Sequence, residues 1–140
     1  MANEVDNESR ILKHLEMIQN AITRMATNSF LIKGWAFILI TIASAFAINS
    51  DTKEGLVLVL GALLVPLWLL DAYFLSLERK YRELYGSISK SEATDMSMAP
   101  PKETAAYSNM WHSFFSKTLV PFYVTLVVAF VAVYLLSGGN

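Results

Sequence analysis

Asp71 is the residue whose type and position most strongly suggest chemistry. It is the single charged side chain in the apolar segment LVLVLGALLVPLWLLDAYFLSL, residues 56–77. Lys33 lies 18 positions before Asp51, and Asp71 lies 17 positions after Glu54. An antiparallel helical hairpin would therefore place Lys33 and Asp71 at nearly equal depth. Because ionisable groups inside a bilayer are costly, we predict an intramembrane ion pair within one subunit or between neighbours. The alternative is that Lys33 extends to the interface and Asp71 reaches water through a cytoplasmic vestibule.

A second candidate site is a face of small and polar residues on the first apolar segment. Thr41, Ser44 and Ile48 recur there at helical spacing. Thr125 occupies a comparable position in the last apolar segment. Such residues either allow helices to pack closely or line a wet path through a membrane. We take Thr41, Ser44 and Ile48 as candidate pore-lining residues and keep helix packing as the alternative.

A basic cluster of Arg79, Lys80 and Arg82 directly follows the second apolar segment. A cluster in this position is typical of a cytoplasmic flank that contacts anionic lipid headgroups. Together with Arg24, it could instead bind a cytosolic anionic ligand such as a nucleotide. These four residues are therefore candidates for either lipid or ligand binding.

No pattern in the sequence points to catalysis or to a metal. The chain has no Cys, which excludes disulfides and thiol chemistry. His14 and His112 have no metal-type partner three or four positions away. There is no Gly-rich phosphate loop, serine elbow or paired carboxylate motif. The net charge of −1 provides no basic field for duplex nucleic acid. We therefore expect no enzyme activity, no cofactor and no metal.

Three apolar segments must position these residues. A bilayer core of about 30 Å needs about 20 apolar residues in a helix. Residues 30–48, 56–77 and 118–136 meet this requirement, and residues 49–55 form a polar external hairpin loop between the first two. Pro66 predicts a kink in the second span. We expect an all-α integral membrane protein with three transmembrane helices.

Residues 1–29 predict a cytoplasmic amphipathic helix that continues into the first span. No Gly or Pro interrupts the chain before Gly34. Its apolar residues follow the heptad spacing 4, 3, 4, 3, and they are Ile11, Leu15, Ile18, Ile22 and Met25. About two heptads are too short to hold an isolated coiled coil together. We predict that this seam packs on a helical extension of the second span, against Tyr81, Leu84, Tyr85 and Ile88, and that it contributes to an oligomer.

Residues 78–117 are expected on the cytoplasmic side. They comprise the helical extension over 78–90, a linker over 91–104 that is rich in Ser, Thr and Pro, and an interfacial helix over 107–117. Of all the Lys and Arg residues, Lys53 alone falls on the other side of the spans. This bias places the N-terminus in the cytoplasm and the C-terminus outside.

Two segments carry a resemblance to known proteins. HLEMIQNAITRMATNSFLIKGW (14–35) and LDAYFLSLERKYRELY (70–85) resemble small bacterial inner-membrane proteins. Their architecture is similar to the transmembrane effectors of anti-phage defence systems, in which a partner enzyme makes a nucleotide signal and the membrane protein oligomerises or opens. The resemblance implies a bacterial inner membrane and a cytosolic nucleotide-type ligand or partner enzyme. The third span is a departure from the simpler two-span members.

These observations predict a homo-oligomeric inner-membrane channel or pore-type effector, gated by a cytosolic ligand or partner. Three spans can hardly enclose a pore alone, and closed cyclic symmetry is the usual way for copies to assemble. Membrane lipids and further copies of the chain are therefore the expected partners. The alternative is a non-conducting membrane anchor or accessory subunit that recruits a partner through the N-terminal helix.

Overall fold

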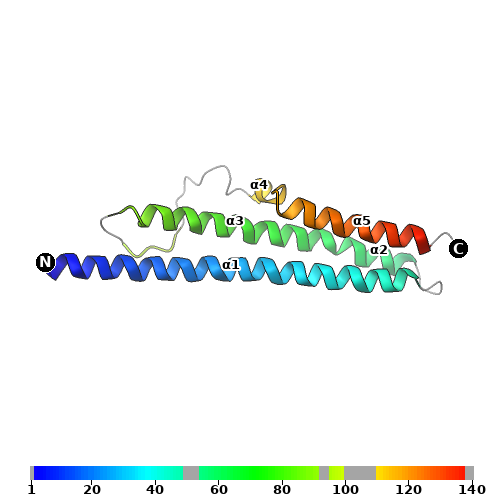
Figure 1. Ribbon diagram of the computed structural model, residues 1–140, viewed down its shortest axis with the longest axis horizontal. Helices are drawn as coiled ribbons and strands as arrows, with labels where there is room; N and C mark the ends of the chain where they lie inside the picture. The colour runs from blue at the N-terminus through cyan, green and yellow to red at the C-terminus, as the bar shows by residue number, and fades with distance from the viewer. Residues whose placement is uncertain (1, 49–53, 92–94, 100–109, 138–140) are drawn as a thin grey trace.

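The part of the chain that the structure describes is almost entirely helical (Figure 1). The computed structural model describes residues 2–48, 54–91, 95–99 and 110–137. Within them lie five helices: α1 (Ala2–Ile48), α2 (Glu54–Ala62), α3 (Leu64–Ile88), α4 (Met110–Phe114) and α5 (Leu119–Ser137). The described residues contain no strand, so the predicted all-α class is confirmed.

Three helical stretches are long and apolar enough to cross a membrane, as the sequence predicted. They are Val5–Ile48, Leu58–Ile88 and Leu119–Leu136. Only 22%, 17% and 17% of their most apolar windows are buried inside the bundle. Large apolar side chains such as Trp35, Phe37 and Val128 are consequently exposed. Soluble monomers rarely expose so much contiguous apolar surface, so this surface suggests a membrane location.

The helices form an elongated bundle with two distinct halves (Figure 1). α1 runs along the whole bundle, α3 lies antiparallel beside it, and α5 covers one end of the pair. We call the three-helix part the apolar half; it comprises residues 29–48, 54–76 and 119–137. We call the two-helix part the stalk; it comprises residues 5–28 and 77–91. The start of α1 and the end of α5 lie at opposite ends of the bundle.

α1 is one uninterrupted helix of 47 residues. At 1.5 Å per residue it is about 70 Å long, more than twice the thickness of a bilayer core. The predicted amphipathic helix over 1–29 and the predicted span over 30–48 therefore belong to a single helix, with residue 1 outside the described residues. This helix connects the stalk and the apolar half without a hinge.

The second apolar segment is divided at Leu63 into α2 and α3. The interruption lies three residues before Pro66, which has no N–H to donate to the carbonyl of Ala62. The helix then continues to Ile88, and the N–H of Ser89 donates to the carbonyl of Tyr85 at 2.9 Å. The predicted extension to residue 90 therefore ends two residues early.

The remaining segments differ in detail from the sequence prediction. The predicted interfacial helix over 107–117 contains α4 at Met110–Phe114, and residues 107–109 lie outside the described residues. Two further groups also lie outside the described residues: 49–53 of the predicted hairpin loop, and 92–94 and 100–104 of the predicted linker. The last span begins at Leu119, whose N–H donates to Ser116 Oγ at 3.1 Å. This contact satisfies one of the free N–H groups at the start of α5.

Small residues bring the helices of the apolar half together. Ala36 on α1 and Ala72 on α3 are fully buried in a core that also contains Tyr123 of α5. At Gly61, a Cβ atom would lie 3.0 Å from the ring of Phe130 on α5. Small residues at such positions let helices approach closely where lipid offers no hydrophobic driving force.

The core of the stalk consists of aliphatic side chains. Ile18 and Ile22 of α1 pack with Leu84 of α3. Partly buried side chains surround these three residues: Tyr81, Tyr85, Ile88 and Met98. The heptad seam of α1 therefore packs against the face of α3 that was predicted from the sequence.

Candidate functional site

A buried polar network joins α1, α3 and α5 where the two halves meet. Asp71 is fully buried, and its Oδ2 lies 2.6 Å from Lys33 Nζ. The hydroxyl of Ser29 donates to Asp71 Oδ1, and Lys33 Nζ also donates to Ser29 Oγ at 2.8 Å. Tyr123 contributes a hydroxyl 3.3 Å from Asp71 Oδ2. Each of the three long helices thus supplies at least one member of the network.

Helix geometry explains how the network is assembled. Ser29 and Lys33 are four residues apart on α1, so they lie on one face a turn from each other. The fully buried Ala72, next to Asp71, leaves room for α1 and α5 to approach α3. The hydroxyl of Tyr123 also lies 3.4 Å from the carbonyl of Leu67, one turn before Asp71. The carboxylate is therefore surrounded by donors from two other helices.

The network can stabilise a charge away from water. A buried carboxylate is tolerated only when it is paired and its oxygens are hydrogen-bonded. Asp71 meets both conditions through Lys33, Ser29 and Tyr123. Among the described residues, every buried side-chain nitrogen or oxygen has a partner. The arrangement fixes the relative depth of the three helices.

The predicted partners Lys33 and Asp71 are in contact within one chain. The Lys33 side chain is 24% exposed, so it is neither fully buried nor extended into solvent. Sequence reasoning missed Ser29 and Tyr123. The spacing of Ser29 to Lys33 was a usable signal for the first of these. No sequence signal indicates Tyr123, because its position depends on how α5 packs.

The candidate pore-lining residues lie on the outside of the bundle. Thr41 and Ile48 are exposed, and Ser44 is half-buried. The hydroxyl of Thr41 donates to the carbonyl of Phe37 at 2.8 Å, so it is satisfied by its own helix. The three residues do not surround a channel within one chain. Any water path along them would require other copies.

Two arginines of the basic cluster make contacts, one between α3 and α4 and one within α3. Arg79 Nη1 donates to Ser113 Oγ at 3.3 Å, and Arg82 pairs with Glu78 at 2.8 Å. Lys80 is half-buried. Arg24 is exposed in a separate, shallow hollow of about 460 Å³ whose other lining residues are Thr23, Thr27 and Asn28. That hollow is formed by α1 alone.

The seam residues are used inside the chain. Ile18 and Ile22 are buried against α3, and the other three members, Ile11, Leu15 and Met25, are half-buried. A role for the seam in an oligomer is therefore limited to what its partly exposed edge can contact.

His14 holds a loop against the stalk. It is fully buried, and its Nε2 lies 3.0 Å from the carbonyl oxygen of Ser97. Met98, next to Ser97, packs on the stalk core. No spacing in the sequence indicates this contact, because 83 positions separate the two residues.

An aromatic stack attaches α4 to the apolar half. The ring of Trp68 lies 4.3 Å from that of Phe114 and 5.3 Å from that of Tyr123, measured between centroids. Trp68 Nε1 also donates to the carbonyl of Phe114 at 3.2 Å.

The chain matches no family model, no curated protein and no solved structure.

Proposed function

We propose that the chain is an integral membrane protein that acts as the subunit of a homo-oligomeric channel or pore-type effector gated from the cytosol. The continuity of α1 from Ala2 to Ile48 carries this proposal. A ligand or partner that displaces the stalk moves the apolar half with it, because no hinge separates them. Ser29 and Lys33 pass that displacement to α3 and α5 through Asp71.

The membrane location is supported by the surface of the apolar half. Its exposed side chains are large and apolar on all three long helices, as Phe37, Val65 and Val128 illustrate. The distribution of Lys and Arg favours a cytoplasmic stalk and an external end of α5. The bacterial inner membrane and the setting in anti-phage defence rest on the resemblance of the sequence alone.

Assembly from several copies is supported by the filled core. Ala36, Tyr123 and Leu126 occupy the space between the helices of one chain. The face of Thr41, Ser44 and Ile48 is turned outward instead. A ring of copies with cyclic symmetry could bring these faces around one axis, where their small and polar side chains would line a wet path.

Gating would come from an anionic cytosolic ligand or a partner enzyme. Arg24 is exposed, and Arg82 retains an exposed side chain despite its pair with Glu78. Arginine binds phosphate groups through paired N–H donors, which suits a nucleotide-type ligand. Both residues belong to the region where the stalk joins the apolar half.

Ion flux from liposomes that contain the purified chain tests the channel. We expect flux, and we expect Thr41→Leu and Ser44→Leu to reduce it severalfold. Thr125→Leu is the matched control, because Thr125 is also exposed and its hydroxyl also donates to its own helix, at Pro121. If Thr125→Leu lowers the flux and Thr41→Leu does not, α1 does not line the path.

A non-conducting anchor is the second candidate, and two observations favour it. Every buried polar side chain of the described residues is satisfied within one chain, so the apolar half needs no neighbour for this purpose. The stalk also exposes Val5 and Leu12 on one side of α1. Liposomes without flux, together with a partner that is lost on Leu12→Glu, would support the anchor over the channel.

A further inference from the structure

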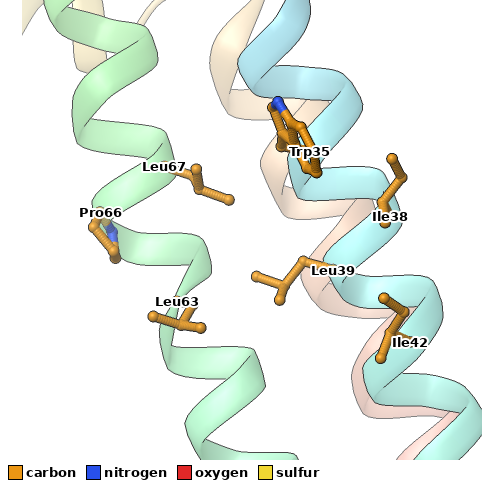
Figure 2. Close-up of a pocket in the computed structure, with 7 residues that line it drawn as sticks. All are labelled: Trp35, Ile38, Leu39, Ile42, Leu63, Pro66 and Leu67. Carbon is orange, nitrogen blue, oxygen red and sulfur yellow. The ribbon is translucent and has the colours of Figure 1, made fainter.

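An apolar groove lies between α1 and α3 just beyond the polar network (Figure 2). Leu39 extends toward it from α1 and Leu67 from α3, and Leu63 lies at the junction of α2 and α3. Its volume is about 430 Å³, and all of its lining residues are apolar. Leu63 is also where the second apolar segment is interrupted.

One flank of α1 connects the groove with the hollow at Arg24 in the stalk. Arg24, Leu31 and Ile38 are spaced by seven residues, which is about two helical turns. They therefore lie on the same side of α1, and Asn28 and Trp35 repeat the same spacing beside them. The apolar members are well exposed, Leu31 at 52% and Trp35 at 64%. This flank changes from polar to apolar between Asn28 and Leu31.

The polar end of the flank offers donors for a phosphate. Thr23 and Thr27 donate their hydroxyl protons to carbonyls of their own helix, those of Gln19 and Thr23. The guanidinium of Arg24 and the amide of Asn28 are the remaining donors of the hollow. A cationic donor beside a neutral one suits an anionic headgroup.

The length of the flank equals that of one lipid leaflet. From Asn28 to Ile42, α1 rises about 21 Å. Half of a bilayer, headgroups included, is about 20–22 Å thick. With residue 30 at the start of the apolar span, Arg24 and Asn28 fall at headgroup depth and the groove at acyl-chain depth.

A flexible hydrocarbon chain suits this groove, because all of its lining residues are apolar and it extends about 10 Å along α1 from Trp35 to Ile42.

We infer that this flank binds an anionic phospholipid of the cytoplasmic leaflet, with an acyl chain in the groove and the phosphate at Arg24 and Asn28. The inference rests on the membrane location in the proposed function and is independent of conduction. It assigns Arg24 to a lipid phosphate, which leaves Arg82 for the cytosolic ligand of the proposed function. It also assigns different roles to the two exposed flanks of α1. Thr41 and Ser44 face other copies, whereas Trp35 and Ile38 face a bound lipid.

Quenching of Trp35 fluorescence by brominated lipids tests this inference. The variant Trp68→Phe/Trp111→Phe leaves Trp35 as the single tryptophan. It is reconstituted into phosphatidylcholine vesicles that contain a small, equal fraction of either brominated phosphatidylglycerol or brominated phosphatidylcholine. We expect about fivefold stronger apparent binding of the phosphatidylglycerol, the factor for about 1 kcal/mol per basic side chain at an anionic surface.

Arg24→Gln should remove this preference and leave quenching by brominated phosphatidylcholine unchanged. Arg10→Gln is the matched control, since Arg10 is exposed on the same flank but 14 residues, about 21 Å, farther into the stalk. It should keep the preference. Native mass spectrometry of the chain with all its tryptophans provides a second measurement if Trp68→Phe disturbs the aromatic stack. Phosphatidylglycerol should then be retained over phosphatidylcholine, and lost on Arg24→Gln.

Equal quenching by the two lipids, or a preference that survives Arg24→Gln, would overturn the inference. Absence of quenching in vesicle-bound protein would mean that another helix fills the groove, which also overturns it. In both cases the proposed membrane function stands. Protein that does not co-float with vesicles would instead contradict the membrane location, and with it both proposals.

Discussion

In the apolar half, three helices meet around a charged pair, whereas in the stalk two helices meet around aliphatic side chains. Asp71 and Lys33 lie at the centre of the first contact, and Ile18, Ile22 and Leu84 at the centre of the second. The difference follows from the solvent proposed for each half. In water, burial of apolar surface is itself a driving force for two helices to associate. In lipid it is not, so polar contacts and close packing of small residues must specify how helices meet.

The comparison also concerns which surfaces each half leaves exposed. The apolar half exposes residues such as Phe37 and Leu58, and it buries its charge. The stalk buries the aliphatic residues of its core, such as Ile18 and Leu84, and exposes charged ones such as Lys13 and Glu16. Because α1 belongs to both halves, one helix changes its pattern of burial near Ser29. Substitutions on either side of that point should therefore have different consequences.

Removal of Asp71 should have the largest effect on stability. Asp71→Ala leaves the ammonium of Lys33 without its carboxylate and Ser29 without its acceptor. Breaking a buried pair in this way costs about 3–5 kcal/mol. We expect a loss of that size in the free energy of unfolding in detergent. Chemical denaturation followed by circular dichroism measures it.

The double variant Lys33→Met/Asp71→Leu separates the pair from its surroundings. Replacement of both charges by apolar groups of similar volume is often neutral or stabilising. We therefore expect it to recover most of the stability that Asp71→Ala loses. Thr41→Val, at an exposed position on α1, the helix of Lys33, is the control and should change stability by less than about 0.5 kcal/mol. If Asp71→Ala lowers the free energy of unfolding no more than Thr41→Val does, the charged pair does not stabilise the apolar half.

Truncation of the stalk core should come second. Leu84→Ala removes a side chain packed on Ile18 and Ile22, and large-to-small changes of this kind cost about 2–5 kcal/mol in a well-packed core. The stalk is a narrow two-helix contact, so we expect about 2–3 kcal/mol. Hydrogen exchange should accelerate in the amides of the stalk and remain slow around Asp71. Uniform acceleration in both halves would show that they unfold as one unit.

Two glycines sharpen the comparison inside the apolar half. A Cβ atom at Gly61 would lie 3.0 Å from the ring of Phe130, whereas one at Gly34 would have no neighbour within 4 Å. Gly61→Leu should therefore cost about 1–3 kcal/mol through overpacking. Gly34→Ala should stabilise by about 0.5–1 kcal/mol, because Ala favours the helix. Thermal unfolding in one detergent compares them directly, and equal shifts would mean that α2 and α5 do not approach closely.

Much of the helical architecture could be predicted from the sequence. Apolar length indicated three helices able to cross a membrane, and Pro66 indicated an interruption that lies at Leu63. A count of residues from the hairpin led to Lys33 and Asp71, which are in contact. These features depend on local pattern or on one short connection, so sequence spacing determines them.

The features that escaped prediction depend on packing between distant segments. Tyr123 reaches Asp71 because α5 packs at a particular depth, and no spacing in the sequence indicates that depth. His14 meets Ser97 because an irregular segment folds back over the stalk. The groove depends on the separation of α1 and α3 near Leu63, which no spacing in the sequence indicates. Sequence periodicity identifies faces of helices, but it does not give the distance between them.

The smallest expected effect comes from the pair Glu78–Arg82, where the stalk joins the apolar half. The two residues are four positions apart on α3, and the Arg82 side chain is 63% exposed. Pairs of this kind in water contribute about 0.3–0.5 kcal/mol, and salt screens them. Glu78→Gln should therefore lower stability by about that amount in dilute buffer and by almost nothing at 1 M salt. The loss in Asp71→Ala should persist at both salt concentrations, because its pair is shielded from solvent ions. Salt dependence thus distinguishes a charge that the stalk presents to water from one that the apolar half encloses, and equal dependence for the two variants would mean that solvent reaches both.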